Sequence, residues 1–220
     1  MTLKEKWEVY TEWLQTNLPQ YATLLNKGAN EEEIDALKNY FPFSLPEELF
    51  ELYRLNNGDA IAKNEPGLGS FMGLEFLPID RIIKEHESWS KIPEDDNTEL
   101  STYCSAKPEG VVKLKYANLK WIPILADYGG NYIGIDLDPD IKGVIGQIIN
   151  FGRDEMDKVQ IARNLDGLLD VVLEEISNGN CNKAIVLEDD GGYSYGLRPQ
   201  SHLIDDLKVI IGIGLTQNRY

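Results

Sequence analysis

The sequence is poor in the residues that build disulfides, metal sites and membrane spans. Only two cysteines, Cys104 and Cys181, and two histidines, His86 and His202, occur among 220 residues. Two distant cysteines behind an N-terminus without an apolar signal core are expected to stay free thiols. They cannot complete a four-ligand zinc site, and no apolar run approaches the roughly 20 residues that cross a bilayer. We therefore expect a cytoplasmic protein without cofactor, metal or membrane segment.

Basic residues are also scarce. The chain has 21 lysines and arginines against 37 acidic residues, which gives a formal net charge of −16. This charge repels nucleic-acid phosphates, so we expect no direct nucleic-acid partner. It suits plain solubility, and it also suits a basic protein partner, whose association an acidic surface accelerates.

The first part of the chain carries three helix patterns, over residues 3–18, 31–41 and 45–55. The first begins with a capping box of Thr2 and Glu5 and stops at Pro19. The second follows Asn30 with an acidic first turn, which the helix dipole favours. Asn57-Gly58 is the expected left-handed end of the third helix.

Strand patterns dominate from residue 68 onward. The expected strands cover 71–77, with a bulge at Gly73, 111–114, 121–126, 132–137, 143–151 and 159–162. We expect helices over 79–89 and 165–176, a second hairpin over 183–197, and a helix or strand over 203–213. The polar stretch 90–110 is expected to be an insertion or mobile loop. This order predicts an α+β fold in which N-terminal helices pack on a mainly antiparallel sheet, followed by a C-terminal helix and extension.

The stretch from Trp121 to Asp140 is the most informative part of the chain. Two apolar runs flank Asp127-Tyr128-Gly129-Gly130-Asn131, a pattern that predicts a β-hairpin with a glycine-containing loop. Trp121 at its start, Tyr128 in its loop, and Asp136 and Asp138 at its end are unusual for a plain core hairpin. Trp121 fits either a binding anchor or a core residue that covers the helices.

Most enzymatic interpretations of this hairpin fail on spacing. Asp136, Asp138 and Asp140 have the spacing of a calcium loop, but Ile141 stands where glycine is needed and Gln147 where a bidentate carboxylate is needed. No phosphate loop and no serine nucleophile elbow occur. Asp127 and Asp136 as a carboxylate pair for glycoside hydrolysis remain the least favoured alternative.

Several segments together resemble the SMI1/KNR4 family of the SUKH superfamily. The run from Leu45 to Gly58 is similar to the family's LP…NG helix signature, and 71–83 to its next element. The family's most recognisable block matches Trp121-Ile-Pro-Ile, Asp127, Gly129-Gly130, 135–139, Gly143 and 146–149. The resemblance covers about residues 30–176. The polar stretch 90–110 and the C-terminal extension depart from the short family version.

The resemblance implies an α+β domain that works by binding proteins. Bacterial members are proposed to be immunity proteins that neutralise toxins, and the fungal namesake regulates cell-wall glucan synthesis. We therefore expect one domain over 1–176, with 177–220 as an extension packed on it.

The leading hypothesis is a non-enzymatic immunity protein that occludes a basic toxin domain through Asp127, Tyr128, Asp136 and Asp138. The alternative is a regulatory scaffold for cell-wall synthesis. Trp121, Gly129, Gly130, Pro139 and Gly143 are expected to hold the shape of the hairpin.

Overall fold

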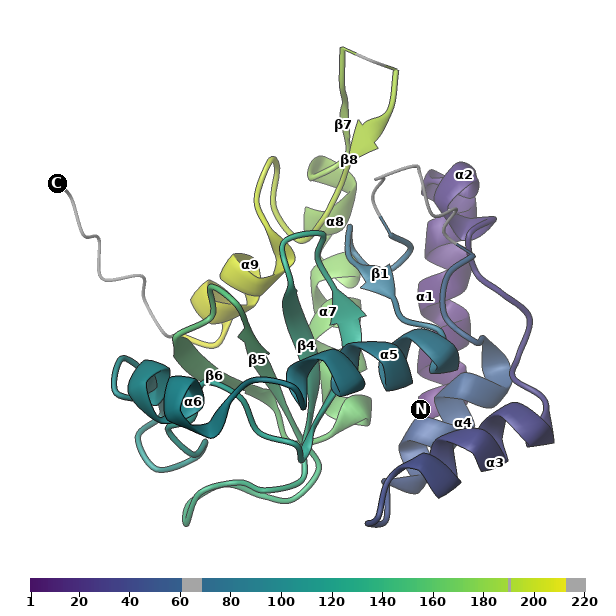
Figure 1. Cartoon of the computed structure of the whole chain (residues 1–220). Coiled ribbons are helices and arrows are strands. Elements are labelled where there is room, and N and C mark those ends of the chain that lie inside the picture. The colour runs from purple at the N-terminus through teal and green to yellow at the C-terminus, as the bar shows by residue number, and fades with distance from the viewer. Residues whose placement is uncertain (61–68, 190, 213–220) are drawn as a thin grey trace, which may run out of the picture.

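The computed structural model describes residues 1–60, 69–189 and 191–212 (Figure 1). Its helices are α1 (Leu3–Asn17), α2 (Pro19–Ala22), α3 (Glu31–Tyr40), α4 (Glu47–Leu55), α5 (Ile79–Trp89), α6 (Glu94–Ser101), α7 (Leu165–Ser177), α8 (Asn180–Lys183) and α9 (Leu203–Ile210). Its strands are β1 (Glu75–Phe76), β2 (Ser105–Lys107), β3 (Trp121–Ala126), β4 (Asn131–Asp136), β5 (Gln147–Gly152), β6 (Asp157–Ala162), β7 (Val186–Leu187) and β8 (Tyr193–Ser194). None of these helices is long and apolar enough to cross a membrane.

The described strands form one six-stranded sheet and a separate small hairpin. The order in the large sheet is β1-β3-β4-β5-β6-β2. All neighbours pair antiparallel except β2, which runs parallel to β6. Every residue of β3, β4 and β5 is buried, so these central strands are covered on both faces. The predicted α+β class with a mainly antiparallel sheet is confirmed.

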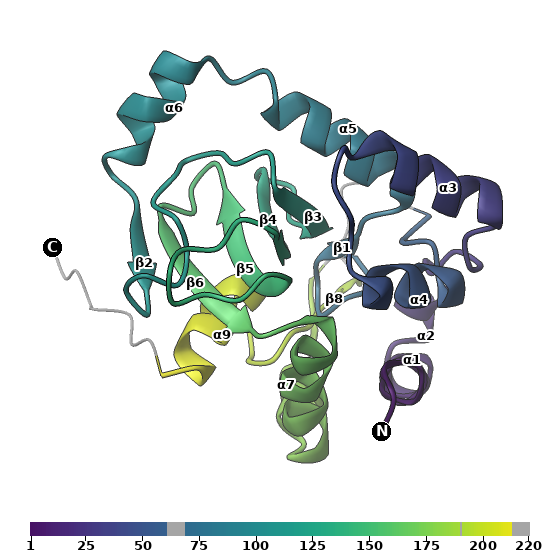
Figure 2. The ribbon, with the colours of Figure 1, turned by 90° about the horizontal axis from the view of Figure 1, so that it is seen from below.

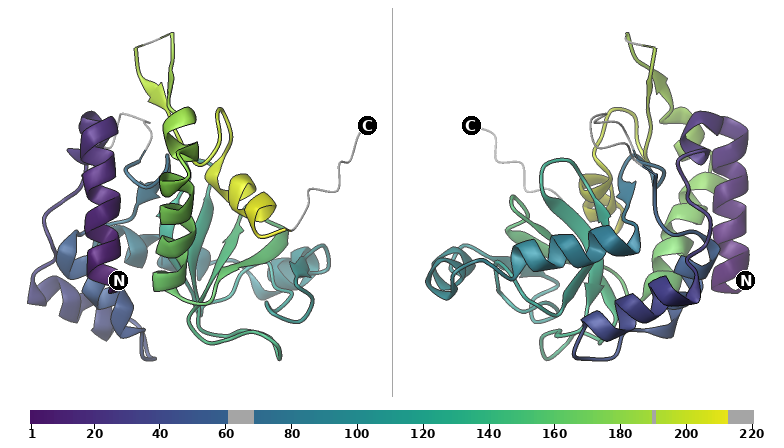
Figure 3. Two further views of the ribbon diagram at one scale, coloured as in Figure 1. Left: turned by 180° about the vertical axis from the view of Figure 1, so that it is seen from behind. Right: turned by 45° about the vertical axis from the view of Figure 1, so that its right-hand side comes forward.

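Helices cover both faces of the large sheet. Helix α5 contacts β3 and α3 on one face. On the other face, α7 contacts β5 and β6, and α9 contacts β6. Figure 1 shows α5 crossing in front of the sheet, and the left view of Figure 3, seen from behind, shows α7 and α9 on the opposite face. Helices α1 and α4 pack on α7, which extends the core away from the sheet.

The N-terminal helices form where the sequence patterns place them. Thr2 and Glu5 make the reciprocal capping box of α1, and Asn30 and Glu33 make that of α3. The apolar face of α1 is buried through Trp7, whose ring stacks on Phe71 at a centroid distance of 6.2 Å. The C-terminal cap of α4 is Asn56 in an extended conformation, and left-handed Gly58 follows two residues later.

Three strand predictions were wrong in extent. The expected strand 71–77 is a tight turn followed by β1, because Gly73 has a φ of +89° and short bridges close residues 69–74. Residues 111–114 form no strand. The strand expected over 143–151 begins only at Gln147, since the preceding residues form the loop after β4.

The polar stretch 90–110 is not the irregular loop that its composition suggested. Pro93 occupies the N-cap position of α6, whose first turn carries Glu94, Asp95 and Asp96, and β2 follows. Helix α6 has no buried residue, so it lacks the apolar stripe by which a helix is recognised in sequence.

Buried side chains of the segment after α7 belong to the same hydrophobic cluster as those of the sheet and the N-terminal helices. Tyr195 is buried and its hydroxyl donates to the carbonyl of Gly69. Leu203, Ile204 and Leu207 of α9 belong to the hydrophobic core. The expected second hairpin is present as β7 and β8, although Asp190 in its turn lies outside the described residues, as does the end of the chain from residue 213.

Candidate functional site

The hairpin that the sequence singled out is the centre of the sheet. Strands β3 and β4 pair from Trp121 opposite Asp136 to Ala126 opposite Tyr132, with an irregularity between Pro123 and Leu125. The loop that joins them, 127–130, lies at the upper end of the sheet in Figure 1. The loop that follows β4 lies at the opposite end, which faces the viewer in Figure 2.

Asp136 lies inside the fold. The residue is 0% exposed. Its carboxylate accepts hydrogen bonds from Trp121 Nε1 at 3.1 Å, Gln147 Nε2 at 2.8 Å and the Asp138 amide at 2.8 Å. Burial raises the pKa of this carboxyl, although the three donors oppose the shift. Asp136 thus ties β3, β4 and β5 together and presents no oxygen to a partner.

Trp121 is a core residue by position. It is 2% exposed, packs on the ring of Phe151 at 5.5 Å, and has the ammonium of Lys158 at 5.4 Å from its ring centroid. Lys158 is itself buried, and burial lowers its pKa to about 8. The core interpretation of Trp121 fits this environment.

The turn after β4 is held by neighbouring segments. Burial alone would raise the pKa of Asp138, but hydrogen bonds from Lys113 Nζ at 2.6 Å and Asn118 Nδ2 at 3.0 Å outweigh it and lower the pKa. A Cβ on Gly143 would lie 2.2 Å from the Val111 carbonyl oxygen and 2.7 Å from Cβ of Pro139. Only glycine fits at position 143 without a shift of these neighbours. The structural roles of Gly143 and Pro139 stay predictions.

The 127–130 loop is shaped by Asp127. Its Oδ1 accepts from the amides of Gly129 at 2.7 Å and Asn131 at 2.8 Å, and its Oδ2 accepts from Asn131 Nδ2 at 2.9 Å. Gly130 has a φ of +90°, a left-handed conformation that disfavours other residues. Tyr128 at the tip is 51% exposed.

A cavity of about 460 Å³ lies beside this loop. Asp127, Tyr128 and Gly129 line one side. The remaining lining comes from the 72–74 turn and from Ser194, Tyr195, Gln200, Ser201, His202 and Leu203. The cavity therefore joins the hairpin loop to the C-terminal segment.

Two features mark this cavity beyond its size. His202 Nε2 lies 3.7 Å from Asp127 Oδ2, and the two side chains form an ion pair whenever the imidazole is protonated. Met72 and Gln200 line it with φ values of +48° and +50°, and non-glycine residues in this region gather at functional sites. No sequence pattern pointed to His202, because 75 residues separate it from Asp127 and only tertiary packing joins them.

Buried carboxyls elsewhere were also missed by sequence reasoning. Asp59 accepts from Ser70 N, Ser70 Oγ and Phe76 N, and burial raises its pKa to about 6. With Glu75 and Arg81 it lines a second cavity of about 660 Å³. Within residues 1–60, 69–189 and 191–212, no group of three His, Cys, Asp or Glu side chains is placed to hold a metal ion.

These observations describe an α+β domain in which the β3–β4 hairpin lies inside the sheet. The 127–130 loop of this hairpin borders a cavity at the surface. The sequence model of the SMI1/KNR4 family (SUKH-1) matches residues 28–171, and the chain belongs to this family.

Three of the curated relatives carry names that refer to the cell wall or to glucan synthesis. The chain is 31% identical to the fission yeast (Schizosaccharomyces pombe) "cell wall biosynthesis/cell cycle regulator smi1" over 94% of this chain and 42% of that protein. It is 23% identical to the Saccharomyces cerevisiae "cell wall assembly regulator SMI1" over 86% of this chain and 43% of that protein. It is 25% identical to a Neurospora crassa "glucan synthesis regulatory protein" over 79% of this chain and 38% of that protein. The chain thus spans about two-fifths of the length of these relatives.

Proposed function

We propose that this chain is a non-enzymatic, cytoplasmic protein-binding domain that takes part in regulating cell-wall synthesis. The observation that carries the proposal is the match of nearly the whole chain to a relative named as a cell-wall regulator. This corresponds to the alternative hypothesis from the sequence. The leading hypothesis of toxin neutralisation gains no support from the relatives named above, and neither does a basic toxin as partner.

We place the proposed contact at the open end of the hairpin, on Tyr128 and the adjoining cavity. Tyr128 combines a large apolar ring with a hydroxyl, a combination common at binding hot spots. Asp127 fixes the loop through three hydrogen bonds, so Tyr128 is held in place before a partner arrives. Asp138, which keeps some exposure, remains a weaker candidate at the opposite end, and buried Asp136 is left out of the contact.

The experiment replaces the matching part of the fission yeast relative with this chain. In cells that lack the native protein, we expect the hybrid to restore resistance to a wall-digesting enzyme. A hybrid that accumulates to normal levels without restoring resistance contradicts the proposal.

A Tyr128→Ala hybrid tests the contact. Loss of a hot-spot tyrosine costs about 2 kcal/mol of binding, so we expect weaker rescue and less co-purified partner. Tyr103→Ala is the matched control, because Tyr103 is 68% exposed and does not line this cavity. Equal behaviour of the two variants places the contact elsewhere.

A further inference from the structure

The turn that forms part of the wall of the cavity beside Tyr128 has a strained backbone. Residues 69–74 close on themselves through two short bridges. Met72 in this turn is buried and has a φ of +48°. A left-handed backbone is costly for a residue with a side chain, so it persists only where surrounding contacts impose it. The turn therefore depends on side chains that hold it in this shape.

Helix α1 holds the turn through Tyr10. This side chain is buried, and its hydroxyl bonds the turn twice: it donates to the Ser70 carbonyl at 2.6 Å and accepts from the Met72 amide at 3.1 Å. The Tyr10 ring also packs on the Phe71 ring, with the centroids 5.1 Å apart. One side chain thus fixes the peptide groups on both sides of Phe71.

A buried carboxylate holds the same turn. Asp59 accepts from the Ser70 amide at 2.8 Å, from the Ser70 hydroxyl, and from the Phe76 amide at 3.0 Å. Burial raises the pKa of this carboxyl to about 6, so it is mostly ionised at neutral pH and its hydrogen bonds are charge-assisted. Because Phe76 belongs to β1, Asp59 fixes the turn relative to the edge of the sheet.

The C-terminal segment supplies a third contact. Buried Tyr195 donates its hydroxyl hydrogen to the Gly69 carbonyl and also lines the cavity. Tyr10 and Tyr195 both lie outside residues 28–171, which the family model matches. Segments on both flanks of the family region therefore hold a turn that belongs to it.

The position of this turn shapes the cavity. Met72, Gly73 and Leu74 form part of its wall, and most of the exposed wall surface is apolar. If Met72 relaxed to a negative φ, the peptide groups on both sides of it would rotate and this part of the wall would move. The contacts that impose the strained φ therefore set the apolar surface that a protein partner meets.

We propose that Tyr10 and Asp59 are positioning residues for the cavity beside Tyr128. They hold Met72 in its left-handed conformation and so give the cavity wall the shape to which a partner binds. Neither is among the described residues that line this cavity, so both act through the turn. The effect on the turn stands by itself, whereas the effect on binding rests on the contact proposed above.

The first test measures the backbone of Met72 by NMR in the full chain. Tyr10→Phe removes one hydroxyl and keeps the ring. We expect altered Cα and Cβ chemical shifts of Met72, which report its φ, and amide exchange there about tenfold faster, the size of one lost hydrogen bond. Wild-type shifts in this variant overturn the proposal.

Asp59 is tested by a pair of variants. Asp59→Ala removes all three hydrogen bonds and should alter the Met72 shifts in the same way. Asp59→Asn keeps an oxygen that accepts from the Ser70 and Phe76 amides, so it should restore most of the wild-type signals. If Asp59→Ala does not fold, Tyr10→Phe decides.

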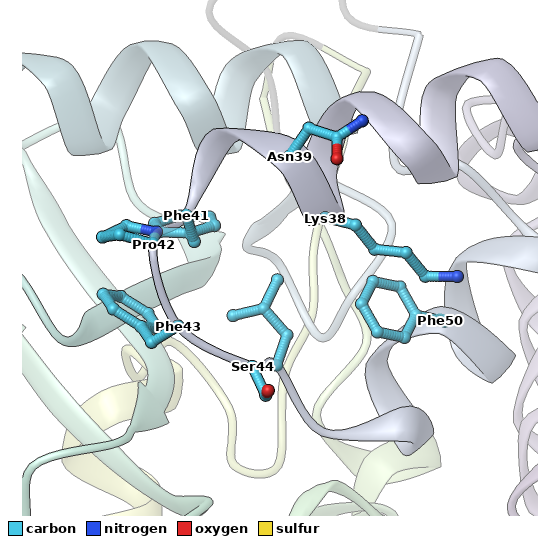
Figure 4. Close-up of a pocket in the computed structure, with 8 residues that line it drawn as sticks. Lys38, Asn39, Phe41, Pro42, Phe43, Ser44 and Phe50 are labelled. Carbon is cyan, nitrogen blue, oxygen red and sulfur yellow. The ribbon is translucent and has the colours of Figure 1, made fainter.

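Tyr53→Phe is the matched control for Tyr10→Phe. Tyr53 is equally buried, and its hydroxyl donates to the Leu77 carbonyl at 2.6 Å, outside the turn. Phe43→Leu is a second control, in a separate hollow of about 550 Å³ between α3 and α4 (Figure 4). None of the described residues that line this hollow lines the cavity beside Tyr128. Both controls should leave the Met72 shifts unchanged.

The effect on binding is tested in the fission yeast hybrid. At equal protein levels, Tyr10→Phe should weaken rescue and Tyr53→Phe should not, whereas a merely stabilising role would make the two variants alike. Loss of rescue in Tyr128→Ala with full rescue in Tyr10→Phe overturns the positioning role and leaves the contact in place. Full rescue in both contradicts the contact itself and, with it, the positioning role.

Discussion

At the scale of single residues, two aspartates two positions apart have opposite environments. Asp136 is buried with three donors on its carboxylate, whereas Asp138 is partly exposed and paired with Lys113. Asp136→Ala leaves the Trp121 and Gln147 donors unsatisfied inside the sheet, so we expect a loss of about 3 kcal/mol in the free energy of unfolding.

Asp138→Ala is the comparison, because it removes a surface ion pair and a hydrogen bond, with an expected loss of about 1 kcal/mol or less. Urea unfolding of both variants measures the difference. Equal losses contradict the structural role of Asp136.

Because of Lys158, we expect the free energy of unfolding to change with pH in the alkaline range. Burial lowers its pKa from the usual 10.5 to about 8, so the folded chain holds this proton less tightly than the unfolded chain. The stability tied to this group is complete above pH 10.5 and is lost as pH falls through 8.

As pH falls from 10.5 to 7.5, the free energy of unfolding of the wild type should therefore decrease by about 3 kcal/mol relative to that of Lys158→Met. Below pH 7.5 it should change little more. Urea unfolding of both proteins at several pH values measures this, and the methionine variant cancels the other titrations. If the two proteins differ in unfolding free energy by the same amount at every pH, the pKa of Lys158 is not lowered by burial.

The sequence located the hairpin residues but could not assign their environments. The Gly-Gly loop and flanking apolar runs placed β3 and β4 nearly to the residue. Whether Asp136 faces solvent depends on Trp121 and Gln147 in neighbouring strands, and no local pattern reports that. The same holds for His202, which reaches Asp127 only through the packing of the C-terminal segment.

At the scale of elements, the close approach of β3 and β4 depends on Gly134. A Cβ there would lie 2.1 Å from the Ile122 carbonyl oxygen and 2.9 Å from Cε1 of Phe151. Gly134→Val should therefore lower the free energy of unfolding by about 3 kcal/mol or more, because the Ile122 backbone and the Phe151 ring must both move.

Gly179→Ala is the control. Its position has a φ of +71° but open space around it, so the expected cost is about 1 kcal/mol. Shifts in the urea midpoint compare the two. A small effect of Gly134→Val shows that the strands can separate without penalty.

Elements with a strong local signal were predictable, and those without one were not. The capping box of α1, Asn30 with the acidic first turn of α3, and the apolar stripe of α7 predicted three helices. Helix α6 lies on the surface with no buried side, and β2 is three residues long and pairs parallel with a strand about 50 residues later. Periodicity carries no information about either.

At the scale of the whole molecule, the C-terminal segment is part of the core. Cys181, Tyr195 and Leu207 are buried among residues of the family-matched region. A chain that ends at Ser177 would expose this surface, so we expect it to bind a hydrophobic dye and to lose its cooperative thermal transition. A truncated chain that melts as sharply as the full chain would make 177–220 a dispensable extension.

The packing of α1 on α7 joins the beginning of the fold to its last large helix. Lys6 Nζ contacts Asp166 Oδ2 at 2.7 Å and Asp170 Oδ1 at 2.6 Å, across 160 residues of sequence in the first case. On the ribosome, α1 therefore emerges on the order of ten seconds before its partner helix is made. During that interval the face of α1 that packs on α7 has no partner, which makes the nascent chain a natural client for chaperones that shield apolar segments.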